Sequence, residues 1–438
     1  VANPFAPTFN TSRFRLTTKD GSVYLVDERL GLLEQRDLNG NTLVLNRDAQ
    51  NRVTSLVSNQ SSSGGASVAT ITISRDAAGR VDYIRDPASR DVDYIYDTSG
   101  RLASVTNRAL EVTQFRYENA LFPRYLTKIV DPRGIAALRS EFDSAGKLIK
   151  QIDAEGKETV FTRGIDGTGR FEKVKDRLGN ETAFYYDARG NVTLKIDPLG
   201  GQTAFAYDAN DNPLTVTDPL GHTRSTTYDA RNNPLSETDA LGHATTFTYN
   251  ALGLPLVVTD PRGKVTSNVY DGKGNLLSTT DAKGGVTSFI YDGGGRLTQI
   301  KNALNHTTTH AFTPEGWPAS TTDALGHTTT WTYDYNGNRL TQSVTRTKAD
   351  GSTSVEAIAY SYDSENRLIK TTFADGTFSQ TAYNAFGKPA STTDPLGRVT
   401  SYSYDNRGNL TATSYADGAS ESSTFDDENR VIATTDRA

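Results

Sequence analysis

The sequence predicts an all-β fold: a continuous array of about 19 antiparallel β-hairpin repeats of 21 residues, curling as a spiral sheet or solenoid-like strip. Three observations support this prediction. An aromatic residue recurs every 21 residues from Tyr186 to Tyr333, two turn signals recur within each interval, and the runs between turns have the length of strands. A fixed period over many intervals is the signature of a repeat architecture.

The aromatic position holds Tyr in most repeats and Phe in a few, and it is usually followed by Asp. We interpret this row as structural, because aromatic side chains pack across neighbouring strands. Its members are Tyr96, Tyr186, Tyr207, Tyr228, Tyr249, Tyr270, Tyr291, Phe312, Tyr333, Tyr362, Tyr383, Tyr404 and Phe425.

Two turns divide each repeat. The first turn follows the aromatic residue, as in Asp187-Ala188-Arg189-Gly190, and the second turn follows about ten residues later, as in Asp218-Pro219-Leu220-Gly221. An Asp side chain accepts a hydrogen bond from a backbone N–H two residues on, and Gly permits positive φ. Asp, Pro and Gly at positions one, two and four match a type I turn. The predicted structural turn residues are Asp187, Gly190, Asp197, Gly200, Asp218, Gly221, Asp239, Gly242, Asp260 and Gly263.

The runs between turns are typical of strands. Thr245, Phe247 and Tyr249 alternate with smaller residues, which predicts a strand with one aromatic face. The other strand of each repeat is less regular, because Pro213-Leu214 and Leu276-Leu277 break the alternation. Helix is disfavoured because Gly or Pro interrupts the chain so often.

The array is predicted to span residues 21–438, after a lead-in of residues 1–20 without a clear repeat. Longer intervals predict extended loops at residues 59–65 and near Gly351. The hydrophobic fraction of 35% is low for a protein with a large core. A single-layer sheet, wet on at least one face, fits this composition better.

Charge and composition exclude several function classes. The net charge of −6 and the lack of a basic stripe argue against nucleic acid as the main partner. The absence of cysteine excludes disulfides, thiolate metal sites and thiol catalysis. No apolar run approaches the ~20 residues that span a bilayer as a helix. The absence of both Cys and Met favours an oxidising setting outside the cell.

Histidines and carboxylates do not form a predicted active site. His222, His243, His306 and His327 share one position after the second turn, and a row of histidines suggests a metal. Same-position residues of consecutive hairpins lie ~9.6 Å apart, too far for one coordination shell, so we interpret the row as a repeated turn. His310 has no identifiable partner. The Asp residues start turns and lack calcium-loop spacing. We therefore predict no catalytic residue, no metal site and no cofactor.

The pattern Tyr-Asp-Ala-Arg-Gly-Asn, followed by Thr-Asp-Pro-Leu-Gly-His, resembles the YD repeat of RHS-repeat proteins over about residues 20–438. That family includes bacterial polymorphic toxins, cocoon components of insecticidal toxin complexes, wall-associated proteins and teneurins. The resemblance implies a β-strip that spirals into a hollow shell, often around a toxin. The family's Asp-Pro-x-Gly-Leu motif for self-cleavage is absent, since Arg398 follows Asp394-Pro395-Leu396-Gly397.

The leading functional expectation is a non-enzymatic scaffold: part of a secreted or cell-surface shell that encloses or displays another polypeptide, such as a toxin. Two alternatives stay open. The aromatic row could bind cell-surface glycans, or a strip that ends at Ala438 could pair its free strand edge with other copies as an extracellular fibre. Because the chain starts at Val1 and stops within a repeat, a segment of a longer shell is favoured over the fibre.

Overall fold

The computed structural model describes residues 13–18, 21–59, 67–347 and 351–437, which form 39 strands and no helix. The strands are assigned to one 39-stranded sheet. The prediction of an all-β array of antiparallel hairpins is confirmed. Most of the predicted lead-in, most of the loop at 59–65 and Asp350 beside Gly351 lie outside the described residues.

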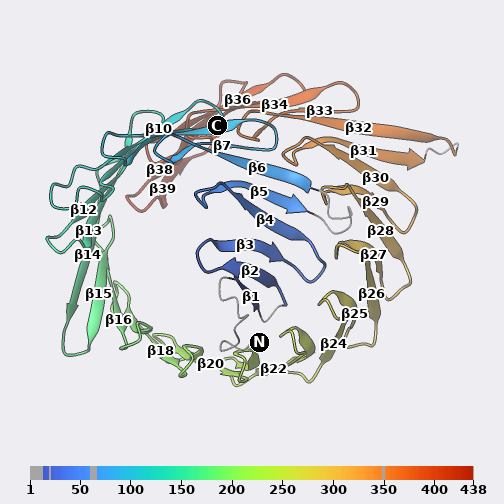
Figure 1. Cartoon of the computed structure of the whole chain (residues 1–438), viewed down its shortest axis with the longest axis horizontal. Coiled ribbons are helices and arrows are strands. Elements are labelled where there is room, and N and C mark those ends of the chain that lie inside the picture. The colour runs from blue at the N-terminus through green and yellow to red at the C-terminus, as the bar shows by residue number, and fades with distance from the viewer. Residues whose placement is uncertain (1–12, 19–20, 60–66, 348–350, 438) are drawn as a thin grey trace. The chain divides into compact units, whose positions relative to one another are not determined.

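Residue contacts divide the chain into two compact units, each built from segments far apart in sequence. Unit 1 comprises residues 1–91, 229–236 and 244–360, and unit 2 comprises residues 92–228, 237–243 and 361–438. In Figure 1 the segments of unit 1 are mostly blue and yellow to orange, and those of unit 2 are mostly cyan to green and red.

Unit 1 contains these strands: β1 (Arg13–Thr17), β2 (Val23–Asp27), β3 (Gly31–Arg36), β4 (Thr42–Arg47), β5 (Val53–Asn59), β6 (Ser67–Arg75), β7 (Val81–Arg85), β22 (Ala244–Tyr249), β23 (Pro255–Thr259), β24 (Val265–Tyr270), β25 (Leu276–Thr280), β26 (Val286–Tyr291), β27 (Leu297–Lys301), β28 (Thr307–Phe312), β29 (Pro318–Thr322), β30 (Thr328–Tyr333), β31 (Arg339–Thr347) and most of β32 (Thr353–Tyr362). Strands that follow one another along each segment pair antiparallel, from β1 to β7 and from β22 to β32.

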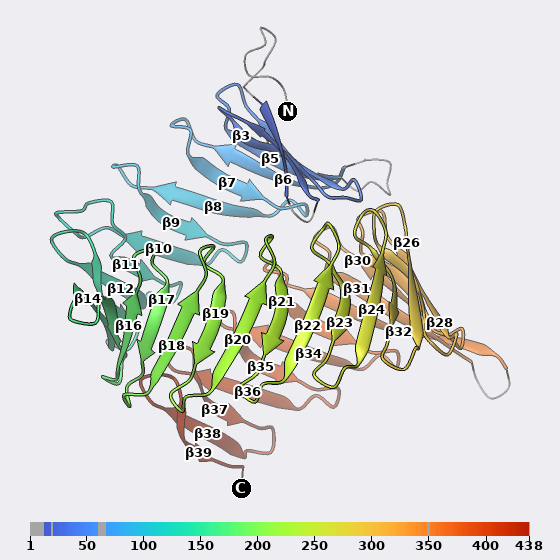
Figure 2. The ribbon, with the colours of Figure 1, turned by 90° about the horizontal axis from the view of Figure 1, so that it is seen from below.

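Unit 2 contains these strands: most of β8 (Asp91–Tyr96), β9 (Leu102–Thr106), β10 (Val112–Arg116), β11 (Lys128–Val130), β12 (Ala136–Phe142), β13 (Leu148–Asp153), β14 (Glu158–Ile165), β15 (Arg170–Lys175), β16 (Glu181–Tyr186), β17 (Val192–Ile196), β18 (Gln202–Tyr207), β19 (Pro213–Thr217), β20 (Thr223–Tyr228), β33 (Leu368–Thr372), β34 (Phe378–Tyr383), β35 (Pro389–Thr393), β36 (Val399–Tyr404), β37 (Leu410–Ser414), β38 (Ser420–Phe425) and β39 (Val431–Thr435). Figure 2 shows β16 to β20 side by side in chain order, each antiparallel to the next. The short strand β21 (Pro234–Thr238) has residues in both units.

The two turns of a repeat differ in the strand pairing beside them. Between β18 and β19, Ala206 pairs with Thr215 but Tyr207 pairs with Pro213, so Leu214 is an extra residue in a β-bulge. Between β17 and β18, across a second turn, no register shift occurs. A bulge adds one unpaired residue and increases local twist. It therefore explains why alternation fails at Pro213-Leu214, and the same bulge leaves Leu277 unpaired.

The sheet has little buried interior. Among the described residues, the buried hydrophobic side chains are Ala183 and Tyr185, and none of the large side chains is fully buried. Backbone pairing and turn bonds, more than a dry core, hold this sheet together.

Candidate functional site

A typical first turn is closed by an aspartate carboxylate. In the turn after β16, Asp187 Oδ1 accepts hydrogen bonds from the backbone N–H groups of Arg189 and Asn191, both at 2.9 Å, and Oδ2 accepts one from Asn191 Nδ2 at 3.1 Å. The N–H of Gly190 donates to the Asp187 carbonyl, with φ of 99° at Gly190. A left-handed residue after a type I turn is a common hairpin closure and favours glycine.

The second turns repeat this geometry. In the four predicted second turns, Asp Oδ1 accepts from the backbone N–H groups two and four residues later, and the glycine three residues later has positive φ. The residues placed this way are Asp197, Gly200, Asp218, Gly221, Asp239, Gly242, Asp260 and Gly263. These carboxylates are thus engaged by their own turns.

The histidine row belongs to the same turns. The Nδ1 atoms of His222, His243 and His327 each lie 3.0 Å from Oδ2 of the Asp that starts the turn. His306 donates its backbone N–H to Asn302 Oδ1 at 3.0 Å. His310, without a predicted partner, has Nδ1 2.9 Å from Thr321 Oγ1. Within the described ranges, no three His, Asp or Glu side chains are grouped to hold a metal ion.

Five tyrosines of the aromatic row tie their hairpin to the preceding one. The hydroxyl of each of these five donates to the carbonyl of the residue fifteen positions earlier: Tyr207 to Val192 at 3.0 Å, Tyr228 to Pro213 at 3.1 Å, Tyr270 to Pro255 at 3.2 Å, Tyr383 to Leu368 at 3.0 Å and Tyr404 to Pro389 at 2.9 Å. Each acceptor begins a strand, and so the hydroxyl joins two strand ends. These tyrosines therefore have a bonding role within the sheet.

Several rings of the row are also covered by a cation from sixteen residues earlier. Arg170 lies over Tyr186, Arg296 over Phe312, Arg367 over Tyr383 and Lys388 over Tyr404, at 4.8–5.5 Å from the ring centroid. Such contacts are favourable cation–π interactions. A sugar ring would have to displace these cations before it could stack on the same faces.

We predict that Tyr404→Phe destabilises the sheet by about 1 kcal/mol, because it removes one hydrogen bond and leaves the Pro389 carbonyl without that donor. Urea denaturation followed by circular dichroism measures the effect. Tyr335→Phe is the matched control, because Tyr335 is 81% exposed. Equal unfolding midpoints for Tyr404→Phe and the unmodified protein would show that the hydroxyl contributes nothing.

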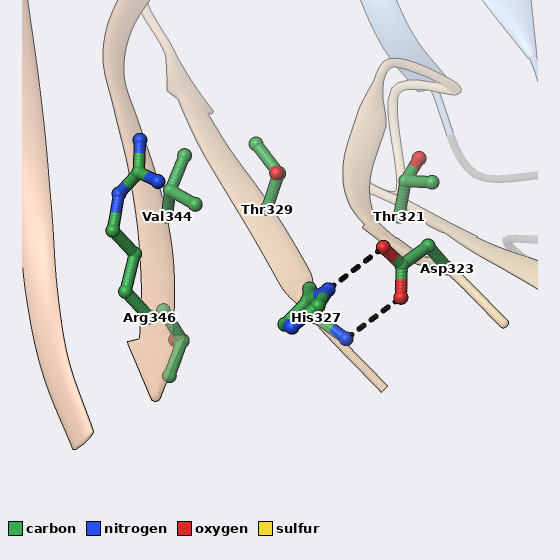
Figure 3. Close-up of a pocket in the computed structure, with 7 residues that line it drawn as sticks. Thr321, Asp323, His327, Thr329, Val344 and Arg346 are labelled. Atoms are coloured by element: carbon green, nitrogen blue, oxygen red, sulfur yellow. Dashed lines mark hydrogen bonds and ion pairs between the residues drawn. The ribbon is translucent and has the colours of Figure 1, made fainter. Parts of the chain in front are cut away.

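The pocket in Figure 3 lies beside the second turn between β29 and β30. It has a volume of about 400 Å³ and is lined by Thr321, Asp323, His327, Thr329 and Arg346, with Val344 and Thr345. Dashed contacts in Figure 3 join His327 to Asp323. The backbone N–H of His327, and then its ring, hold the pKa of Asp323 below its usual value.

This pocket recurs with the repeat. A second pocket of about 400 Å³ is lined by Val216, Asp218, His222, Arg224, Ala240 and Leu241, again beside a second turn. An Asp–His pair can act as a general base only if it is within reach of a nucleophile or substrate proton. Here the pair closes a turn, and its recurrence indicates repeat geometry more than a single catalytic centre.

The sequence reasoning missed a charged contact within unit 2 between second turns and first turns about 250 residues later. Arg177 donates from its backbone N–H and Nε to Glu428 Oε1, at 2.7 and 3.1 Å. Asp153 Oδ2 accepts from Arg177 Nη1 at 3.1 Å and Arg407 Nε at 2.7 Å. Asp427 pairs with Lys157 at 2.8 Å. We call these six residues the charged seam. The available signal was Arg177 and Asp427, which stand where the central repeats hold uncharged residues such as Pro198 and Ala188.

Unit 1 contains a polar counterpart of this seam. Asn336, in a first turn, donates to Asp86 Oδ2 at 2.8 Å and accepts from the backbone N–H of Ala88 at 3.2 Å. Asn275 donates to Asn39 Oδ1 at 3.2 Å. Asp86 and Asn39 lie in second turns. In both units, then, second turns of an early segment contact first turns of a late segment.

The described residues contain no helix with the length and hydropathy needed to cross a lipid bilayer. The sequence model of the RHS repeat matches residues 186–223, 228–265, 270–307, 312–353 and 383–420. No curated protein matches this chain in sequence.

Solved toxin-complex structures share the fold. The TcdB2-TccC3-TEV crystal structure is similar with a TM-score of 0.61 and 15% identity, over 99% of this chain and 25% of that chain. The TcdB2-TccC3-Cdc42 structure has a TM-score of 0.55 and 16% identity, over 94% and 23%. The Photorhabdus luminescens Tc holotoxin pore has a TM-score of 0.54 and 13% identity, over 94% and 26%. This chain thus spans about a quarter of those it matches. The RHS repeat matches and the hairpin array together show that this chain belongs to the RHS/YD-repeat family.

Proposed function

We propose that this chain is a non-catalytic segment of a shell wall that encloses or displays another polypeptide, such as a toxin. The observation that carries the proposal is a sheet with almost no buried interior. Within each unit, second turns from an early part of the sequence contact first turns from a late part. Such a sheet has large faces available to a second polypeptide. Curling of the strip into a spiral, as open sheets of many strands tend to do, would give the wall its concave face.

The chemistry of the side chains supports a structural role. The Asp and His residues that could have served as acid and base are bonded within their own turns, as in Asp323 and His327. The pockets beside those turns recur with the repeat. A catalytic centre would require reactive side chains that one repeat has and the others lack. Neither of the two pockets is lined by such side chains.

We further propose that the partner is the polypeptide that the complete shell surrounds, and that the shell works outside the cell that makes it. The similar structures belong to toxin complexes, and one is named for TcdB2-TccC3 with Cdc42. Glycan binding through the aromatic row is a weaker candidate. The hydroxyls of Tyr207 and Tyr404 are bonded to carbonyls, and the ring of Tyr404 is covered by Lys388.

Protection from protease tests the enclosure. An unfolded reporter polypeptide fused after Ala438 should be digested about tenfold more slowly than the free reporter, because a wall limits access of the protease. The control is the same reporter and linker fused to an unrelated all-β protein. Digestion at the rate of the free reporter would contradict enclosure. Enzymatic turnover that a single substitution such as His327→Ala abolishes would contradict the non-catalytic role.

A further inference from the structure

A pocket in unit 1 combines aromatic rings with carboxylates and lies between an early second turn and two late first turns. Its volume is about 720 Å³, which is within the range of small-molecule sites. Pro87 comes from the second turn between β7 and β8, and the first turns are those after β28 and β30. None of the described residues that line the pocket is basic. Its charged and aromatic lining consists of Glu315, Trp317, Tyr333, Asp334 and Tyr335.

Trp317 stands where other repeats place a cation. Arg296 lies at the same turn position, and it covers the aromatic ring sixteen residues later. In the next repeat this residue is Trp317, whose ring centroid lies 5.3 Å from that of Tyr333 at an interplanar angle of 45°. Gly337 lets the indole lie close, because a Cβ there would stand 3.1–3.2 Å from three indole atoms. Among the described residues, no cation lies over the ring of Trp317, Tyr333 or Tyr335.

Glu315 is a carboxylate at a turn position that forms ion pairs elsewhere. Glu428 occupies the same position in a first turn of unit 2 and pairs with Arg177 at 3.1 Å. Glu365 likewise lies 3.6 Å from an arginine of a second turn. Arg177 is the second residue of its turn, and the residue at that position beside Glu315 is Pro87, which carries no charge. Within the described ranges, the Glu315 side chain has no ion pair or hydrogen bond.

The pocket therefore presents two carboxylates and three aromatic rings, and it lacks the cation that related turns contain. The donors to the Asp334 carboxylate are backbone N–H groups and the amide of Asn338, all uncharged, so its own turn supplies no counter-charge. Aromatic faces and carboxylates attract the same kind of ligand, an organic cation. A neutral sugar would stack on the rings but would leave both carboxylates without a counter-charge.

We propose that this pocket binds an organic cation of the alkylammonium class, held against the rings of Trp317 and Tyr333 and beside the carboxylate of Glu315. The ammonium group can belong to a free small molecule or to a lysine side chain of a polypeptide, because both present a positive charge on apolar carbons. The proposal goes beyond the wall function, since it holds whether or not the wall encloses anything.

Indole signals in two-dimensional nitrogen–proton spectra of the full chain test the site, because the sequence has two tryptophans. Choline should shift the signal of Trp317 saturably. The signal of Trp331 should stay fixed, since that ring is already covered by Arg339 and its N–H bonds a glutamine. Trp331→Phe assigns the two signals. The tert-butyl analogue of choline, which has carbon in place of the charged nitrogen, should bind at least about tenfold more weakly.

Saturation transfer to the choline methyl protons compares the variants. Trp317→Asn introduces the residue that Asn338 provides in the next first turn, so the fold is kept and affinity should fall about 30-fold. Glu315→Gln removes one charge and should weaken binding about fivefold. The matched control is Glu28→Gln, which changes an exposed first-turn glutamate of unit 1 outside the pocket lining. Its affinity should equal that of the unmodified protein.

A lysine peptide and its norleucine counterpart distinguish the two sources of the ammonium group. Tighter binding of choline indicates a free quaternary ammonium compound, and tighter binding of the lysine peptide indicates a polypeptide. The proposal is overturned if neither binds, if the neutral analogue binds as well as choline, or if methyl glucoside binds in their place. Unchanged affinity in both pocket variants also overturns it. Protease protection of the fused reporter is a separate measurement, so either proposal can fail alone.

Discussion

Replacing Arg407 with alanine is expected to destabilise unit 2 by about 2–3 kcal/mol, because the change leaves a largely buried carboxylate without one of its two cations. The Arg407 side chain is 9% exposed and the Asp153 side chain 18% exposed. Arg407 bonds Asp153 at 2.7 Å and approaches Asp427 at 3.4 Å. The desolvation of Asp153 opposes its charged form, yet hydrogen bonds from the Lys157 backbone, Arg407 and Arg177 lower its pKa overall.

Hydrogen exchange followed by mass spectrometry measures this change locally. Exchange should rise in β13 to β16 and in β36 to β39, whose turns form the charged seam, and should stay unchanged in β24 to β30 of unit 1. Arg398→Ala is the matched control, because Arg398 is 66% exposed and pairs with Asp394 of its own turn. Surface pairs of that kind contribute little. Equal exchange in both variants would mean that the seam does not hold the two segments together.

Acid is expected to unfold the array cooperatively below about pH 4, while stability stays nearly constant from about pH 5 to 8. Backbone N–H groups lower the pKa of turn carboxylates, with Asp97, Asp239, Asp323, Asp394 and Asp426 as examples. A carboxylate with a depressed folded-state pKa stabilises the fold above its unfolded pKa. That contribution is lost as pH falls through the folded-state value, and many turns lose it together.

Circular dichroism during acid titration measures this transition, and the sequence itself supplies the comparison variant. Asn250, Asn302 and Asn384 already start turns, and their Oδ1 atoms accept the same two backbone N–H bonds. The triple change of Asp239, Asp323 and Asp394 to Asn should therefore keep the fold at neutral pH and make the acid transition shallower. Loss of structure centred near pH 6–7 would instead indicate histidine titration and contradict this account.

Much of the fold could be predicted because its rules are local. The aromatic period, the Asp and Gly of each turn and the alternation in β22 all act within about one repeat. The bulge was harder, because Leu214 looks like any strand residue until the register with Ala206 and Tyr207 is known. The hydroxyl bonds of the tyrosines were not predicted either, since they require the distance between strand ends of adjacent hairpins.

The candidate site was only partly predictable. The sequence placed the histidine row in turns but could not show that the Nδ1 atoms of His222 and His327 bond the turn aspartates. It raised sugar stacking for the aromatic row, and could not show that Arg367 and Lys388 cover two of those rings. Side-chain direction decides both questions, and a one-dimensional pattern does not contain it.

The sequence by itself determined the hairpin repeat, because a typical turn is stabilised by an Asp and a Gly within five residues, and each strand by residues in the next. Only the tertiary structure decided which turns meet across about 250 residues, such as Arg177 with Glu428. That pairing depends on the twist and curvature that accumulate over many strands and their bulges. Small local deviations therefore decide which distant turns lie side by side.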